Sequence, residues 1–305
     1  MPSAPAQSET QPPPAPLAWR KNPDALKAAL VCPDCRVPLE SSPALRCGGC
    51  GFTVEAEQGV PRLWPPSRAA ELQKSIASFK TPHSSARQSP LLRALLPPGP
   101  VCDPDERARH ARVKDAMSSG LIVNLGSKSA DWGAHVVNLD LVLPASGAEN
   151  VDILGDIERL PFADNSIDGV ICTYVLEHVG DGRACIDEIA RVVKPGGQVY
   201  ITVPFLFPTH PDPLDRWRWT LDGLRYSFRA FDEIEAGTSG GPFTAYVAIV
   251  PTLTASLFSN FYLFNAVRFT LGWLLWPLKF LDLLAWRSKK SYMAASNFYF
   301  RGRKR

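Results

Sequence analysis

Short apolar runs alternate with amphipathic stretches over the last two thirds of the chain. Such runs are typical of buried strands, and we expect seven of them, at residues 121–125, 136–140, 151–156, 168–173, 198–203, 231–236 and 297–301. Residues 182–193 carry Cys185, Ile186 and Ile189 on one helical face, and Lys194-Pro-Gly-Gly ends that helix. Strands that alternate with helices predict a doubly wound α/β domain with a mainly parallel, seven-stranded sheet.

The first part of the chain is patterned differently. Six of the first sixteen residues are Pro, so residues 1–27 are predicted to form a disordered arm, and they lack the apolar centre of a signal peptide. A small module follows at 28–66, then a linker with helices at 67–118, and the α/β domain at 119–305. The linker helix is expected to begin with Asp103 as N-cap and Pro104 at N1.

Four of the seven cysteines follow the pattern C-x2-C-x11-C-x2-C, at positions 32, 35, 47 and 50. Without an export signal, this spacing indicates a metal site, which also points to the cytosol. Each C-x2-C turn presents two thiolates, and Cys32, Cys35, Cys47 and Cys50 together fill the tetrahedral shell of Zn²⁺. A closed shell of four thiolates leaves no position for water, so we expect a structural zinc ion. The alternative is a ribbon that has lost its metal.

The net charge of +3 is too small to indicate nucleic acid, but its distribution is uneven. Residues 286–305 hold seven Lys or Arg and no acid, whereas residues 236–267 hold no charge at all. Pro251, Pro277, Arg268 and Lys279 interrupt the apolar segment, so it does not form a clean transmembrane helix. We expect an apolar helical insertion at 238–295 whose residues 250–290 make peripheral membrane contact, with Trp and basic side chains at the interface. An insertion packed on the sheet or at a dimer interface is the alternative, and a spanning hairpin is a third.

In parallel sheets of this kind, ligands bind at the carboxyl ends of the strands. Gly126 follows the first predicted strand, where a glycine lets the backbone approach a ligand closely. Asp140 ends the second strand, and its carboxylate suits two ribose hydroxyls. Asp156 ends the third and can accept from an adenine amino group. An acid after the second strand without a phosphate cradle predicts a nucleoside ligand that carries no pyrophosphate.

Three segments then resemble class I S-adenosylmethionine (SAM) dependent methyltransferases of the type 11 kind: Gly155–Val170, Val175-Leu-Glu-His-Val179 and Arg191-Val-Val-Lys-Pro-Gly-Gly197. The segment from Pro204 to Thr220 is similar to bacterial methyltransferases of undefined substrate, some of them associated with glycan or lipid-linked pathways. The cysteine module resembles the zinc ribbon that precedes some methyltransferases and that also occurs alone as a subunit activating them.

The resemblance implies a SAM site at defined positions. Asn124 stands where the family carries an acid, and the family loop after it is usually richer in glycine. Gly126 and Ser127 would form this shortened loop, in which Lys128 replaces a glycine, either to pair with the SAM carboxylate or as a solvated residue. The remaining cofactor contacts implied are Asp140 on the ribose, Asp156 and Ile157 at the adenine, Thr173 and Tyr174 at the methionine end, and Glu177 and His178 beside the site.

Candidate catalytic residues follow the fifth predicted strand, at the same edge of the sheet. His210 is a suitable general base near neutral pH, and Asp212 and Asp215 accompany it. Alternatively, His210, Asp215 and Arg216 tie down a lid by hydrogen bonds. Cys172 is expected to be inert packing, and Asp34 a turn residue.

The sequence thus predicts a SAM-dependent methyltransferase in the cytoplasm, on or near the inner face of the membrane. Its acceptor would be a small molecule, a glycan or a lipid-linked compound. One alternative is an rRNA or tRNA methyltransferase, although the zinc module lacks interleaved aromatic and basic residues. Another is a methyltransferase fold that serves as a binding scaffold without activity.

Overall fold

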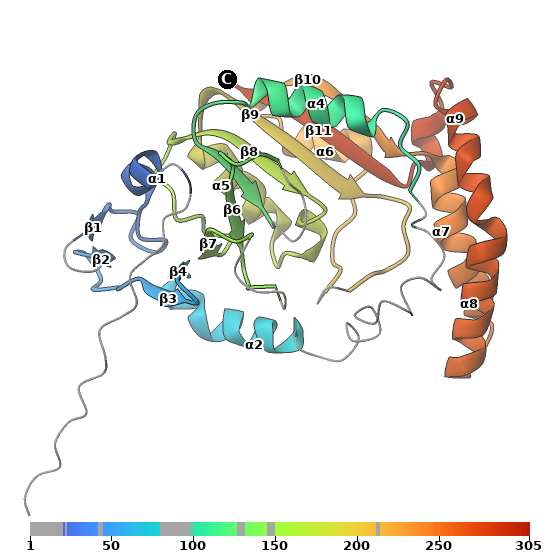
Figure 1. The fold of residues 1–305 in the computed structure, drawn as a ribbon, viewed down its shortest axis with the longest axis horizontal. Helices are drawn as coiled ribbons and strands as arrows, with labels where there is room; N and C mark the ends of the chain where they lie inside the picture. Colours follow the sequence, from blue (N-terminus) through green and yellow to red (C-terminus); the bar gives the residue numbers. More distant parts are fainter. Residues whose placement is uncertain are drawn as a thin grey trace, which may run out of the picture.

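The computed structural model describes residues 21, 23–41, 45–79, 99, 101–126, 132–144, 150–211 and 214–305. Its centre is a nine-stranded sheet with the order β10-β11-β9-β8-β5-β6-β7-β4-β3 (Figure 1). All seven predicted strands are present: β5 (Ile122–Leu125), β6 (Val137–Asp140), β7 (Ile153–Gly155), β8 (Ile167–Thr173), β9 (Val193–Pro204), β10 (Phe231–Gly240) and β11 (Asn297–Lys304). The α/β fold with a mostly parallel sheet is confirmed.

The direction of chain progression reverses at β5. The chain moves outward from β5 through β6 to β7, and then returns to β8 on the other side of β5. β5 to β9 run parallel, while β11 is antiparallel to both of its neighbours, β9 and β10. A reversal of this kind opens a crevice between the loops at the carboxyl ends of β5 and β8.

Helices cover both faces of the sheet because successive side chains of a strand point to opposite sides. Val123 of β5 packs in one apolar cluster with α1 (Pro23–Ala29), α5 (Gly182–Val192) and α6 (Leu221–Ser227). Its neighbour Ile122 packs on the opposite face against α4 (Glu106–Ala116) and Trp132. α4 precedes β5 in the chain, so it covers this face where the short connection between β5 and β6 leaves little room for a helix.

The sheet has two more strands than predicted, and both come from the cysteine module. β1 (Leu39–Ser41) and β2 (Leu45–Cys47) form a separate hairpin. β3 (Glu55–Glu57) and β4 (Val60–Leu63) form a second hairpin, and β4 pairs in parallel with β7, with Leu63 opposite Gly155. The module therefore extends the central sheet. η1 (Pro66–Arg68) and α2 (Ala69–Phe79) follow it.

Two local expectations were wrong. Residues 23–27, predicted as part of the arm, belong to α1. The cap position of α4 is Asp105 and not Asp103, and its side chain makes no capping hydrogen bond. Asp103 instead forms a buried ion pair with Arg109 of α4. The same carboxylate also accepts from the backbone N–H of Asp105 at 3.2 Å, since an ionised carboxylate has several acceptor positions.

The segment between β10 and β11 is helical. It contains α7 (Pro242–Ala255), α8 (Phe261–Leu275), η4 (Trp276–Leu281), α9 (Asp282–Ala285) and η5 (Ser291–Ala294), which Figure 1 shows together at one side of the sheet. The buried Asp282 accepts from the N–H groups of Phe243 and Thr244 at 2.9 and 2.8 Å, which attaches α9 to the start of α7. Within the described ranges, no helix is long and apolar enough to cross a membrane.

Candidate functional site

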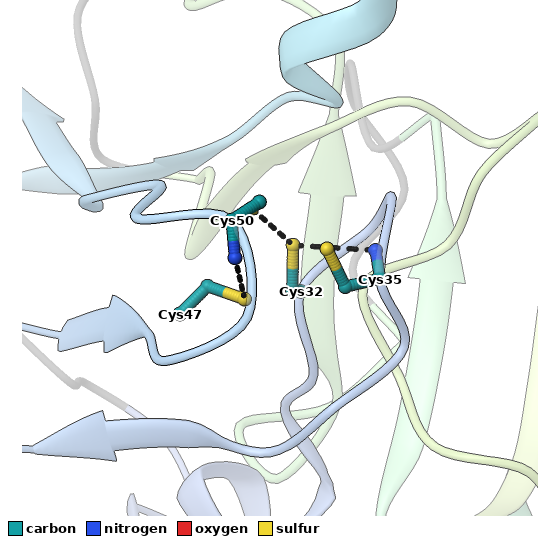
Figure 2. A group of neighbouring side chains, drawn as sticks. All are labelled: Cys32, Cys35, Cys47 and Cys50. Atoms are coloured by element: carbon teal, nitrogen blue, oxygen red, sulfur yellow. Dashed lines mark hydrogen bonds between the residues drawn. The ribbon is translucent and has the colours of Figure 1, made fainter.

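The four clustered cysteines come together from two turns (Figure 2). Their Sγ atoms all lie within 4.8 Å of one another, and those of Cys32 and Cys50 are 3.7 Å apart. Four sulfurs at about 2.3 Å from a tetrahedral zinc ion lie about 3.8 Å from each other. The backbone N–H groups of Cys35 and Cys50 point at the sulfurs of Cys32 and Cys47, each at 3.5 Å, as they would toward thiolates. The donor set therefore fits the predicted structural zinc ion.

Without the ion, the pKa values of the clustered thiols diverge: the hydrogen bond with Cys50 raises the pKa of Cys35 to about 12 and burial raises that of Cys32, whereas the pKa of Cys47 is lowered. Burial raises the pKa of this thiol, but the backbone N–H groups of Cys50 and Gly49 outweigh burial and lower it to about 7. A lowered pKa favours the thiolate, which is the form that binds metal.

The turn between Cys32 and Cys35 also contacts the rest of the protein. The carboxylate of Asp34 accepts from the backbone N–H and the hydroxyl of Ser67, at 2.8 and 2.6 Å, and pairs with Arg159 at 3.1 Å. Arg36 pairs with the buried Glu188 of α5 at 2.7 Å. The sequence predicted only a turn residue at Asp34. In the structure it links the cysteine cluster to η1 and to the loop after β7.

The loop at the end of β5 begins at Gly126. Its φ of +73° lies in the left-handed region, and a Cβ atom there would lie 2.2 Å from Cγ2 of Val175. The backbone after β5 therefore runs directly against the segment after β8, at the edge where the strand order predicts a ligand site. Asn124, two residues earlier in β5, is buried, and its Oδ1 has no hydrogen-bond partner in the described part of the chain.

Asp140 and Asp156 lie at the carboxyl ends of the next two strands, as predicted. Oδ1 of Asp140 accepts from the backbone N–H of Leu141 at 2.7 Å, which orients the carboxylate. Oδ1 of Asp156 accepts from the N–H of Glu158 at 2.9 Å, and Ile157 between them packs against the core. Burial raises the pKa of Asp156.

A cation from η1, directly after the cysteine module, reaches this edge. Nη1 of Arg68, in η1, lies 2.6 Å from Oδ2 of Asp156 and 2.9 Å from Oε2 of Glu158. Oε1 of Glu158 in turn accepts from the N–H of Gly180 at 2.6 Å. The sequence analysis did not identify Arg68, because a lone arginine in Pro-Ser-Arg carries no pattern that points to a partner 88 positions away.

The loop after β8 carries the next group of predicted residues. Thr173 ends the strand, and Tyr174 has a φ of 55° and is partly exposed. Glu177 and His178 belong to η3 (Leu176–His178), a short 3-10 helix separate from α5. Glu177 is fully buried, and neither of its carboxylate oxygens has a hydrogen-bond partner in the described residues.

His210 comes from the segment after β9 and lies against the same carboxylate. Nε2 of His210 and Nε2 of His178 are each 3.8 Å from Oε1 of Glu177. The Glu177 carboxylate raises the pKa of His210, while burial acts in the opposite direction. Asp215 accepts from the backbone N–H of His210 at 2.9 Å and pairs with Arg218.

Arg216 acts through its backbone N–H, which donates to the carbonyl of Glu177 at 2.7 Å. These hydrogen bonds favour the alternative in which His210, Asp215 and Arg216 hold a lid in place. The side chain that pairs with Asp215, however, is that of Arg218 and not that of Arg216. Three predicted site residues, Ser127, Lys128 and Asp212, lie outside the described residues.

The chain resembles known proteins mainly in the part that forms this crevice. Residues 120–201 match the family model described as "Methyltransferase domain". The uncharacterized protein YafE of Escherichia coli (strain K12) is 38% identical over 99 residues, which are 31% of this chain and 46% of that protein. The demethylmenaquinone methyltransferase of Paenarthrobacter aurescens (strain TC1) is 33% identical over 132 residues, 41% of this chain and 49% of that enzyme. The chain thus spans about half the length of these relatives.

A solved structure of the 1,6-didemethyltoxoflavin-N1-methyltransferase of Burkholderia thailandensis is 12% identical, with a TM-score of 0.43. It covers 85% of this chain and 98% of that one, and at this TM-score we draw no conclusion from it. The matched family, the sheet and the residues at its carboxyl edge lead to one assignment. Residues 120–201 carry a domain similar to the methyltransferase family, on an α/β fold with a mostly parallel sheet.

Proposed function

We propose that the protein transfers a methyl group from SAM to a small-molecule, glycan or lipid-linked acceptor. One observation supports this most strongly: Gly126, Asp140 and Asp156 stand at the carboxyl ends of three neighbouring strands beside the reversal of the sheet order. This edge is where doubly wound sheets bind their ligands. The matched methyltransferase family and relatives named demethylmenaquinone methyltransferase agree with it.

Each residue has a task that follows from its chemistry. Asp140 accepts hydrogen bonds from ribose hydroxyls, and Asp156 accepts from the adenine amino group beside Ile157. Gly126 and Tyr174 line the methionine end with Thr173, and the predicted Ser127 and Lys128 contacts complete it. When bound, SAM supplies a sulfonium methyl group that a nucleophile attacks in line, so that positioning is much of the catalysis.

The acceptor side is formed by residues after β8 and β9. His210 is a candidate to take the acceptor's proton on Nε2. Its Nδ1 lies 3.1 Å from the carbonyl of Pro208 and so carries the proton of the neutral ring, while its Nε2 lies on the side of Glu177. Asp215, with Arg218, holds the backbone of His210 in place.

Calorimetric titration with S-adenosylhomocysteine tests the cofactor site. We expect micromolar binding to the zinc-replete protein and loss of at least tenfold in affinity in Asp140→Ala. Asp187→Ala serves as the matched control, because Asp187 is an exposed acid of α5 that pairs with the exposed Arg183. Absence of binding at millimolar ligand would refute the proposal and favour a binding scaffold.

We further propose that the acceptor is met at a membrane surface. The helices between β10 and β11 leave large apolar side chains in solvent, among them Leu257, Phe261, Tyr262, Leu274 and Leu284, and α8 has no buried residue. Tyr262 is 81% exposed and Leu257 79%. Exposed apolar patches of this size mark interaction sites.

The charges beside this apolar surface match anionic lipid. Arg268 of α8 and Arg287, Lys289 and Lys290 after α9 are all exposed, while Asp282, the only acid of the segment, is buried. Basic side chains next to exposed aromatic and aliphatic ones are typical of helices that lie in the membrane interface.

Flotation with phosphatidylcholine vesicles, with and without phosphatidylserine, tests the membrane contact. We expect binding that rises with phosphatidylserine and falls strongly in Phe261→Ser/Tyr262→Ser. Tyr226→Ser is the control, because Tyr226 is also exposed but belongs to α6. Equal flotation of all three proteins, or salt-sensitive binding to RNA without binding to vesicles, would contradict this proposal.

A further inference from the structure

The side chains of Glu177, His178 and His210 form a cluster of three groups that can each bind a metal ion. One ligand atom from each lies within 4.8 Å of the other two. Nε2 of both histidines is 3.8 Å from Oε1 of Glu177, and the imidazole rings are 5.3 Å apart at an angle of 84°. The three residues come from two segments 32 positions apart, so only the fold brings them together.

Backbone carbonyls determine which ring nitrogen of each neutral histidine carries no proton. Nδ1 of His178 lies 2.5 Å from the carbonyl of Leu214, and Nδ1 of His210 lies 3.1 Å from that of Pro208. A carbonyl oxygen only accepts, so both Nδ1 atoms carry the proton in the neutral rings. Nε2 of each ring then presents a lone pair, and both lone pairs face the carboxylate of Glu177.

The carboxylate of Glu177 also lacks a hydrogen-bond donor among the described residues. It is 0% exposed, and neither oxygen accepts a hydrogen bond from any described residue. A buried ionised carboxylate without a partner costs several kcal/mol, roughly, unless a cation or a proton compensates it. The Glu177 carboxylate and the two Nε2 atoms near it therefore call for a positive charge between them, which either a proton or a metal ion supplies.

We propose that Glu177, His178 and His210 bind a divalent transition-metal ion. Two imidazole nitrogens and one carboxylate are ligands that zinc, cobalt, nickel, manganese and ferrous ions share, and the Nδ1–H···O=C contacts are the outer contacts that orient such ligands. Ligands at about 2.1 Å from one ion lie about 3 to 3.4 Å apart, so the side chains close by roughly half an ångström.

Three protein ligands leave coordination positions open. If the ion is bound, a hydroxyl or carboxylate oxygen of the acceptor would complete its shell. This role rests on the proposed function, whereas the binding of the ion depends on the cluster alone. With the ion bound, Nε2 of His210 would be a ligand and not the base proposed above, and the ion would supply a lower pKa for an acceptor hydroxyl, which would then lose its proton to water.

Titration with Co²⁺ of protein whose cysteine site is already filled with Zn²⁺ tests the inference. We expect one further equivalent to bind, with the weak visible absorption of nitrogen and oxygen ligands and without the intense near-ultraviolet band of cysteine thiolates. Glu177→Gln and His178→Ala should each weaken this binding by at least tenfold. His135→Ala is the control, because His135 lies near Met117 and outside the cluster.

A second measurement separates this inference from the proposed function and from unfolding. Circular dichroism and the Tm of the same variants report whether the domain is intact, since Glu177→Gln removes charge with little change of shape, while S-adenosylhomocysteine titration of the wild-type protein reports the cofactor site. Absence of a second cobalt equivalent in protein that binds S-adenosylhomocysteine would overturn the metal site and leave the methyltransferase proposal standing. Equal cobalt binding by wild type and both variants would also overturn it.

Discussion

Arg68 and Asp156 form an ion pair of 2.6 Å that joins the turn directly after the cysteine module to the proposed adenine end of the cofactor site. Arg68 follows β4, and Asp156 follows β7, the strand with which β4 pairs in parallel. Both side chains are largely buried, so water screens the pair little. The module is therefore connected to the site through a side chain as well as through the sheet.

Replacing Arg68 with Met should destabilise the protein and weaken cofactor binding. It leaves Asp156 and Glu158 without their shared cation, which costs on the order of 2–4 kcal/mol of unfolding free energy. We expect a lower Tm and a several-fold higher Kd for S-adenosylhomocysteine, measured by calorimetry. Arg183→Met is the control, since Arg183 is 80% exposed. Equal changes of Tm and Kd in the two variants would show that the buried ion pair contributes no more than an exposed arginine.

Removal of zinc should lower the stability of the whole protein and not of the module alone. Strand β4 belongs to the central sheet, and Asp34 and Arg36 of the first cysteine turn bind Ser67 and Glu188. We expect Cys47→Ser to lose the metal and to lower the single Tm by several degrees. Cys102→Ser, outside the cluster, should keep one zinc ion by elemental analysis. A Cys47→Ser protein with unchanged Tm would contradict the coupling.

Substitution of Gly126 by Ala should abolish cofactor binding through a clash at the crevice. Its Cβ would meet Val175, whereas a Cβ at Gly196, with a similar φ of +80°, would meet nothing within 4 Å. Gly196→Ala therefore measures the cost of the left-handed backbone alone, about 1–2 kcal/mol. We expect S-adenosylhomocysteine affinity to fall more than tenfold in Gly126→Ala and to stay unchanged in Gly196→Ala. Equal effects would assign the loss to backbone strain.

Asp215 should make the protein's stability depend on acid pH. Burial raises the pKa of its carboxyl, but Arg218 and the backbone N–H of His210 outweigh burial and lower it to about 2. Because the folded-state pKa is below the ordinary value of about 3.9, the stabilisation is complete above roughly pH 4 and is lost as the pH falls toward 2.

Asp215→Asn should therefore lower the free energy of unfolding by about 1–3 kcal/mol at pH 6. The difference from wild type should shrink between pH 4 and pH 2, as measured by urea denaturation of both proteins side by side. Asp222→Asn is the control, because the carboxylate of Asp222 is 93% exposed. A difference that stays constant down to pH 2 would rule out the ion pair as its source.

Local patterns in the sequence were enough for the elements and for half of the site. The seven strands, α5 and the positions of Asp140 and Asp156 at strand ends follow from apolar periodicity and from the residues that end each run. The cysteine cluster follows from spacing within two short turns. These features depend on interactions between near neighbours, which the order of residues determines directly.

Only the tertiary structure decided the rest. The pairing of β4 with β7, the contact of Arg68 with Asp156, and the meeting of His210 with Glu177 join segments that are far apart in the chain. The apolar pattern of α8 was compatible with burial and with exposure, and in the fold α8 packs on α7 at one side of the sheet and buries none of its residues. Such contacts depend on how whole layers pack, and no local pattern specifies them.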